Sequence, residues 1–243
     1  MQKNIVLEPA FVLQSRPYRE TSLLVDFWCR NTGRFSGIIK GIKKSQPAWL
    51  GLLQHFTPLL VSAVGHGELK TVTYIELKEM PFFLKGRGFY CAFYLNELVQ
   101  RAIYNPFDAY PELFDFYGET LGFLAKNHDF GAILRAFERV FLKQLGYELR
   151  LDIDIYQQRI DPLKMYFYEA DQGFSLIELV EPQQKNRCFL GASLLAFDQG
   201  LFANLQMRTD AKRLMRLALL PYVGYQKFES AQFFKMPDLT RTD

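Results

Sequence analysis

Basic side chains concentrate near the start of the chain. Residues 16 to 44 hold seven Lys or Arg and two Asp or Glu, a net charge of +5, whereas the whole chain of 243 residues carries only +3. A nucleic-acid backbone is a line of phosphates, and cations along a groove bind it by releasing condensed counterions. We predict phosphate contacts for six of the seven, the alternative being a solvated charged face: Arg16, Arg19, Arg34, Lys40, Lys43 and Lys44.

Aromatic residues are interleaved with these cations. Phe, Trp and Tyr make up 16 % of the chain, and Phe27, Trp28, Phe35 and Trp49 lie within or just after the basic segment. Exposed rings stack on the bases of single strands. Strand alternation buries every second side chain, however, so we expect more of these rings in the core than on the surface.

Two further groups of arginines and lysines have helical spacing. Arg135 and Arg139 are four residues apart and therefore neighbours on one helix face. A guanidinium matches a carboxylate geometrically, so they could clamp a peptide carboxylate; pairing with Glu138 or solvent is the alternative. The second group falls within an arc of roughly 140° on the last helix. It is a candidate nucleic-acid contact or a solvated face, and comprises Arg208, Lys212, Arg213 and Arg216.

Residues suited to covalent catalysis or metal binding are sparse. The sequence has no Gly-x-x-x-x-Gly-Lys-Ser/Thr, Gly-x-Ser-x-Gly or His-Glu-x-x-His motif. Asp152 and Asp154 form the one tight carboxylate pair, which could share a metal in a nuclease but fits a surface strand or loop better. The three cysteines lie far apart without a Cys-x-x-Cys. We therefore predict no enzymatic activity and no cofactor.

The elements that must position these residues change in character along the chain. Residues 1–80 show five short β-patterned runs, at 11–13, 23–29, 35–40, 59–64 and 69–77. Ser22–Lys40 has the pattern of a hairpin, with a turn signal at Asn31-Thr32-Gly33. Five short strands with one longer insertion favour a small closed barrel of the oligonucleotide-binding (OB) type.

Helical periodicity follows. Residues 88–104 are apolar nearly all round, and apolar stripes run over 110–124 and 130–141, with Gly146 at the expected stop. Short strands are expected near 165–168, 173–179 and 188–190, then a helix over 210–220 ending at Pro221. We predict an α+β multidomain chain: an OB-fold DNA-binding domain over 1–80, a helical bundle over 81–149, and over 150–243 a mixed segment that packs on the bundle and adds the basic helix.

The ends and apolar runs indicate a cytoplasmic protein. The first residues hold a single Lys, no long apolar run, and Glu8, which does not resemble a secretory signal. No stretch approaches 18 uninterrupted apolar residues, so we expect no membrane helix.

Several short motifs occur in order along the chain. They are Arg16-Pro17-Tyr18-Arg19-Glu20-Thr21-Ser22, Thr32-Gly33-Arg34, Leu53-Gln54-His55-Phe56-Thr57-Pro58-Leu59-Leu60, Leu145-Gly146-Tyr147 and Leu220-Pro221-Tyr222. In this combination the chain resembles the RecO family of DNA repair proteins over essentially its whole length. The resemblance implies an N-terminal OB barrel, a helical bundle and a C-terminal segment.

The resemblance also implies a function. Such proteins are recombination mediators, not covalent catalysts, that bind single- and double-stranded DNA, anneal complementary strands and act near the nucleoid. Their implied partners are RecR, the acidic Phe-ending tail of single-stranded DNA-binding protein (SSB), and, functionally, the RecA recombinase. Arg135, with Arg139 beside it, would meet the tail carboxylate, and Leu113 and Phe114 would line the adjacent pocket.

One departure from part of the family concerns zinc. Some members carry a four-cysteine zinc site in the C-terminal region, whereas residues 150–204 here contain only Cys188. We therefore expect no zinc site in this chain. The alternatives to a mediator are a metal-dependent nuclease using Asp152 and Asp154, and a plain OB-fold DNA-binding module without protein partners.

Overall fold

The computed structural model describes residues 4–42, 47–105, 108–126 and 129–235. The chain divides into two compact units. The first comprises residues 1–128 and 227–243, and the second residues 129–226. Within the described ranges, no helix combines the length and the apolar character needed to cross a membrane.

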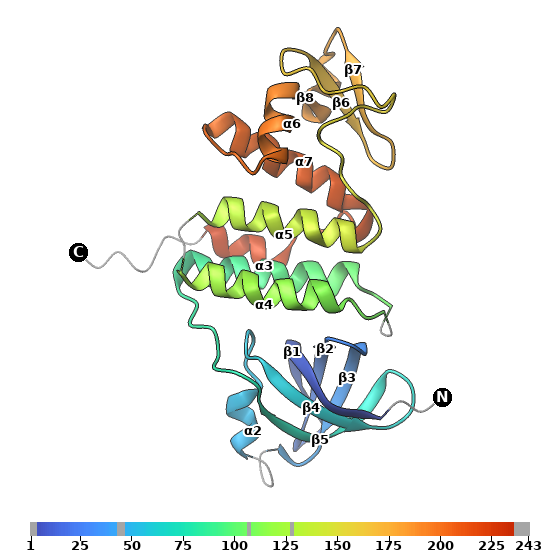
Figure 1. Cartoon of the computed structure of the whole chain (residues 1–243). Coiled ribbons are helices and arrows are strands. Elements are labelled where there is room, and N and C mark those ends of the chain that lie inside the picture. Colours follow the sequence, from blue (N-terminus) through green and yellow to red (C-terminus); the bar gives the residue numbers. More distant parts are fainter. Residues whose placement is uncertain (1–3, 43–46, 106–107, 127–128, 236–243) are drawn as a thin grey trace, which may run out of the picture. The chain divides into compact units, whose positions relative to one another are not determined.

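The first unit begins with a closed five-stranded barrel, which confirms the predicted OB-type architecture (Figure 1). Its strands are β1 (Ile5–Tyr18), β2 (Ser22–Cys29), β3 (Gly33–Ile39), β4 (Leu59–Val64) and β5 (Leu69–Leu77), in the order β1-β2-β3-β5-β4. The β3–β5 pair is parallel and the other pairs are antiparallel. The short helix α2 (Pro47–Leu52) lies between β3 and β4 in the chain.

Alternation along the strands fills the barrel. Val25 and Phe27 on β2, and Phe35 and Ile39 on β3, are buried and belong to one apolar cluster. The intervening residues of β3 are only half-buried. A period of two therefore puts one face of each strand into the core and leaves the other available for contacts outside it.

Strand β1 is longer than the sequence predicts. The apolar run at 11–13 is expected to end at Ser15-Arg16-Pro17, yet β1 continues to Tyr18, with Pro17 opposite Leu23. Pairing of β1 with β4 stops at Ala10. Beyond that residue no described strand pairs with this edge of β1, and an edge strand tolerates a proline.

Two helices pack on the barrel within the first unit, and η2 (Glu229–Lys235) packs on one of them. Helix α3 (Gly86–Ala102) contacts β1 and α4 (Pro111–Lys126), and η2 lies on α3. Phe11 and Trp28 from the barrel meet Phe114 and Tyr117 of α4, with ring centroids 5.0–5.5 Å apart. This aromatic cluster joins the barrel to α4.

The second unit contains helices and a small antiparallel sheet. Its helices are α5 (Phe130–Gln144), η1 (Pro182–Arg187), α6 (Gly191–Asp198) and α7 (Leu205–Val223). Its strands are β6 (Met165–Glu169), β7 (Gly173–Ile177) and β8 (Cys188–Leu190), in the order β7-β6-β8. The three short strands expected in this region are thereby confirmed.

Helix α7 differs from its predicted end. It continues past Pro221 to Val223, and stops at Gly224, whose φ of 76° is left-handed and whose N–H donates to the Leu220 carbonyl. A glycine with positive φ ends helices readily because it has no Cβ.

The helices predicted as one bundle fall in both units. Helices α3 and α4 belong to the first unit and α5 to the second. The division into domains at 1–80, 81–149 and 150–243 stays a prediction.

Candidate nucleic-acid interface

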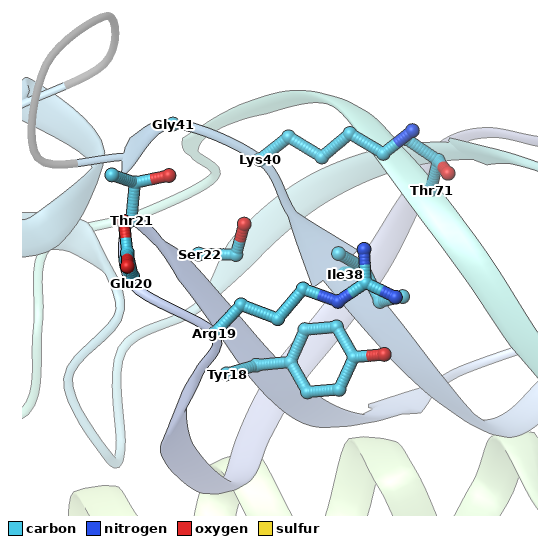
Figure 2. A pocket seen from close by; sticks show the side chains of 9 residues that line it. All are labelled: Tyr18, Arg19, Glu20, Thr21, Ser22, Ile38, Lys40, Gly41 and Thr71. Atoms are coloured by element: carbon cyan, nitrogen blue, oxygen red, sulfur yellow. The ribbon is translucent and has the colours of Figure 1, made fainter.

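An open hollow of about 640 Å³ lies on the barrel where the β1–β2 turn, the end of β3 and the start of β5 meet (Figure 2). We call it the barrel hollow. It is lined by Tyr18, Arg19, Glu20, Thr21, Ser22, Ile38, Lys40, Gly41 and Thr71. Eight of these nine residues, all except Thr71, lie within residues 16–44, the basic segment that the sequence singles out.

The β1–β2 turn positions Arg19 over Tyr18. Tyr18 pairs with Ser22, which leaves three residues in the turn, and Arg19 has a φ of 54°. This left-handed conformation turns its side chain back, and the guanidinium carbon lies 5.3 Å from the centroid of the Tyr18 ring (Figure 2). A cation over a ring is attracted by the ring quadrupole, so the turn holds Arg19 across the hollow.

Arg16, Arg19 and Lys40 are available for a ligand. All three are exposed, and among the described residues no acidic side chain lies within salt-bridge distance of them. Arg16 lies on β1 opposite Leu24, two residues before the hollow begins. Lys43 and Lys44, also predicted to contact phosphates, lie outside the described residues.

Hydroxyl groups surround the cations. Thr21, Ser22 and Thr71 line the hollow together with Tyr18, and all four are half-buried. Hydroxyl and guanidinium groups donate hydrogen bonds to phosphate oxygens without reading bases. The barrel hollow can therefore bind an anionic backbone, with Glu20 as the one acid on its lining.

Arg34 is engaged elsewhere. Its Nη1 donates to the carbonyls of Gln100, at 2.8 Å, and Ile103, at the end of α3. Burial lowers the pKa of this guanidinium, and Asp26 partly offsets that effect. Arg34 therefore caps α3 instead of facing the barrel hollow.

The aromatic candidates for base stacking are mostly interior. Phe27 and Trp28 are fully buried and Phe35 is 4 % exposed. Trp49 is half-buried and packs partly against the barrel core. The ring that does reach the barrel hollow is Tyr18, and the sequence pattern gives no signal that distinguishes it from other strand aromatics.

The cations of α7 belong to the second unit, where Arg208 and Arg213 make charged contacts. Arg208 donates to both carboxylate oxygens of Asp129, at 2.8 and 3.0 Å. Arg213 donates to Asp210 and to main-chain carbonyls, and lies 4.4 Å from the centroid of the Phe189 ring. Lys212 and Arg216 are exposed.

The residues predicted to bind a peptide carboxylate fall in different units. Arg135 and Arg139 lie on α5 in the second unit, and Leu113 and Phe114 on α4 in the first. Arg135 is buried and its guanidinium donates to both oxygens of Glu138. Arg139 donates to the carboxylate of Asp198 at 3.0 Å and remains about one third exposed.

The carboxylate pair considered for a nuclease has structural partners. Asp154 is buried and its Oδ1 accepts the N–H groups of Tyr156 and Gln158, both at 2.9 Å. Asp152 pairs with Arg150, which lowers the pKa of the Asp152 carboxyl. In the part of the chain that the structure describes, no three His, Cys, Asp or Glu side chains gather as a metal site would require.

Comparison with known proteins identifies the family of this chain. Residues 1–81 match the family model for the N-terminal part of recombination protein O, and residues 85–226 match the model for its C-terminal part. The chain belongs to the RecO family. Its relatives include the DNA repair protein RecO of Coxiella burnetii (strain RSA 331 / Henzerling II), which is 36 % identical over 96 % of this chain and 99 % of the relative.

Two other RecO relatives match the chain with similar identity and coverage. The DNA repair protein RecO of Actinobacillus pleuropneumoniae serotype 5b (strain L20) is 38 % identical over 93 % of this chain and 92 % of its own. That of Aromatoleum aromaticum (strain DSM 19018 / LMG 30748 / EbN1) is 34 % identical over 96 % of this chain and 97 % of its own. The predicted RecO resemblance is confirmed, and membership of the family supports a role in DNA repair and recombination.

Proposed function

We propose that this chain is a recombination mediator that binds single- and double-stranded DNA through the barrel hollow and anneals complementary strands. The proposal extends to binding the SSB tail and RecR, and to helping load RecA on SSB-coated strands in the cytoplasm. The observation that carries it is an open, hydroxyl-lined hollow on the OB barrel of a RecO family member, whose cations have no acidic partner among the described residues.

Annealing follows from the charge of this surface. Two strands repel each other through their phosphates, and a basic surface that screens this repulsion lets them pair by their own bases. Arg16, Arg19 and Lys40 provide exposed cations for this purpose. Because the hydroxyls and cations contact the backbone, the expected binding is independent of base sequence.

The first prediction concerns the salt dependence of DNA binding. Replacing Arg19 and Lys40 together by Ala removes two phosphate contacts, so the slope of log affinity against log salt should fall by about 1.4 for single strands. Fluorescence anisotropy with labelled oligonucleotides of different sequence measures this slope. Affinity should fall equally for all sequences, and strand annealing should slow in parallel.

Lys126→Ala serves as the matched control, because Lys126 is an exposed cation at the end of α4 outside the hollow. Its slope should equal that of the unmodified chain. An unchanged slope in the Arg19/Lys40 variant would remove both residues from the DNA site. Cleavage of the labelled strand with Mg²⁺, lost in Asp152→Ala, would favour the nuclease alternative.

Binding of the SSB tail is proposed on α5. Arg139 is the more accessible arginine, whereas Arg135 is held by Glu138. A peptide carboxylate that binds Arg135 must share or displace Glu138, because a guanidinium has a limited number of donors. The two apolar residues that the family resemblance implies for the tail belong to the first unit, where Leu113 is fully buried and Phe114 is 6 % exposed.

The second prediction uses this competition. Arg135→Ala should abolish binding of a synthetic SSB tail peptide while DNA affinity stays unchanged. Glu138→Gln removes the competing charge and should strengthen peptide binding several-fold, which anisotropy with a labelled peptide measures. Weaker peptide binding in Glu138→Gln, with the fold intact by circular dichroism, would show that Arg135 acts only through its pairing with Glu138.

A further inference from the structure

A second hollow lies within the first unit, between the barrel and α4. It encloses about 340 Å³, and we call it the α4 groove. Its apolar lining comes from Phe11, Pro58, Phe82 and Phe114, and from Gly118 and Gly122 of α4. It shares no residue with the barrel hollow.

Two glycines open the α4 side of the groove. Gly118 and Gly122 are four residues apart, so they lie on one face of α4. A Cβ added at Gly118 would lie 3.8 Å from Phe11, and one added at Gly122 would lie 3.6 Å from Phe82, both ordinary contacts. Packing in this chain therefore does not demand either glycine, although each weakens a helix relative to alanine. Because Gly118 and Gly122 have no Cβ, the groove reaches the backbone of α4 at these two positions.

The charged rim of the groove is predominantly acidic. Three acids line it, Glu79, Asp115 and Glu119, against Lys78. Lys78 pairs with Glu79 at 2.6 Å and Arg30 pairs with Asp115 at 2.6 Å. Glu119 is exposed, and among the described residues it has no hydrogen-bond or ion-pair partner.

We propose that the α4 groove is a docking site for a partner protein segment that inserts an apolar side chain and places a Lys or Arg beside Glu119. The apolar walls and the missing Cβ atoms accommodate the apolar side chain close to the helix backbone. Lys78 and Arg30 offset Glu79 and Asp115, so the exposed Glu119 carboxylate is what favours a basic neighbour over an acidic one, because like charges facing each other cost binding energy. The site goes beyond DNA binding. It shares Phe114 with the apolar residues proposed for the SSB tail, but its charged residue is Glu119 instead of an arginine, so it calls for a basic segment where the SSB tail is acidic.

Peptide selection with matched variants tests the groove. A random peptide library displayed on phage is selected on the full chain, and the enriched peptides are measured by anisotropy. Gly122→Leu fills the groove, and Gly122→Ala narrows it with only an ordinary contact to Phe82. Glu119→Lys reverses the rim charge, and Glu68→Lys makes the same change at an exposed residue that lines neither hollow.

The expected peptides pair an apolar residue with Lys or Arg. Their affinity should fall about tenfold in Glu119→Lys, remain unchanged in Glu68→Lys, and be lost in Gly122→Leu and reduced in Gly122→Ala. DNA affinity should be equal in all four variants, which separates this result from failure of the barrel hollow. The proposal is overturned if no enriched peptide is sensitive to Gly122→Ala or Glu119→Lys, or if the sensitive peptides are acidic.

Discussion

At the scale of single residues, the predicted DNA contacts separate according to their partners. Arg19 and Lys40 line the barrel hollow without an acidic partner in the described ranges, whereas Arg34 serves the end of α3. The last carbonyls of a helix have no intrahelical donor, and a cation there also meets the negative end of the helix dipole. Arginines of the same barrel therefore have two roles: Arg19 is available for a ligand, and Arg34 stabilises the end of a helix.

The third prediction therefore concerns Arg34. Arg34→Ala removes the donor for two carbonyls and should lower the free energy of unfolding by about 2 kcal/mol. Arg34→Lys should recover only part of this, because an ammonium is more strongly hydrated than a guanidinium and costs more to desolvate at this partly buried position. Urea unfolding measures both. DNA affinity at low denaturant should stay unchanged; a large loss would return Arg34 to the DNA interface.

At the scale of elements, a buried polar network joins the barrel to α3 and α4. Tyr117 of α4 donates its hydroxyl to the Asn96 side chain on α3. Asn96 Nδ2 lies 3.2 Å from His55 Nδ1, and that ring nitrogen lies 3.3 Å from the Val12 carbonyl of β1. Burial lowers the pKa of His55, although the contact with Val12 partly opposes this.

The fourth prediction is a pH dependence. The His55 side chain has its ordinary pKa, near 6.5, in the unfolded chain and a lower pKa in the folded chain. It therefore takes up a proton more readily when the chain is unfolded. The free energy of unfolding should therefore fall as the pH drops below about 6.5. His55→Gln removes this titration and should give a flatter profile between pH 7.5 and 5. Urea midpoints at several pH values measure it, and identical slopes in the two proteins would contradict it.

At the scale of the whole molecule, the chain returns to the first unit after building the second. Within η2, Phe233 stacks on Tyr90, with centroids 5.6 Å apart, and the N–H groups of Glu229 and Ser230 donate to the Glu97 carboxylate at 2.7 and 2.9 Å. Residues 227–235 therefore cover one face of α3, although the second unit separates them from it along the chain.

The fifth prediction follows from this cover. Ending the chain after Gln226 exposes the α3 rings and leaves Glu97 without these donors. The first unit should lose about 3 kcal/mol of stability, from lost aromatic pairs and hydrogen bonds to a carboxylate. Hydrogen exchange of α3 amides should accelerate accordingly. A chain ending after Lys235 keeps η2 and should match the full chain; equal exchange in both truncations would show that η2 does not stabilise α3.

The sequence by itself determined the strands of the barrel, most of the helices and the RecO family. These depend on local periodicity and on ordered motifs, which are visible without distances. Only the tertiary structure decided which Arg and Lys side chains are free of protein partners and can bind a ligand. Arg34, Arg135 and Arg208 are as basic as Arg19 in the sequence, but each has a partner placed by packing, and for Arg34 and Arg208 that partner is more than sixty residues away. Because a folded chain brings together carboxylates and carbonyls from distant segments, composition predicts where cations gather, and the fold decides which of them remain to bind a ligand.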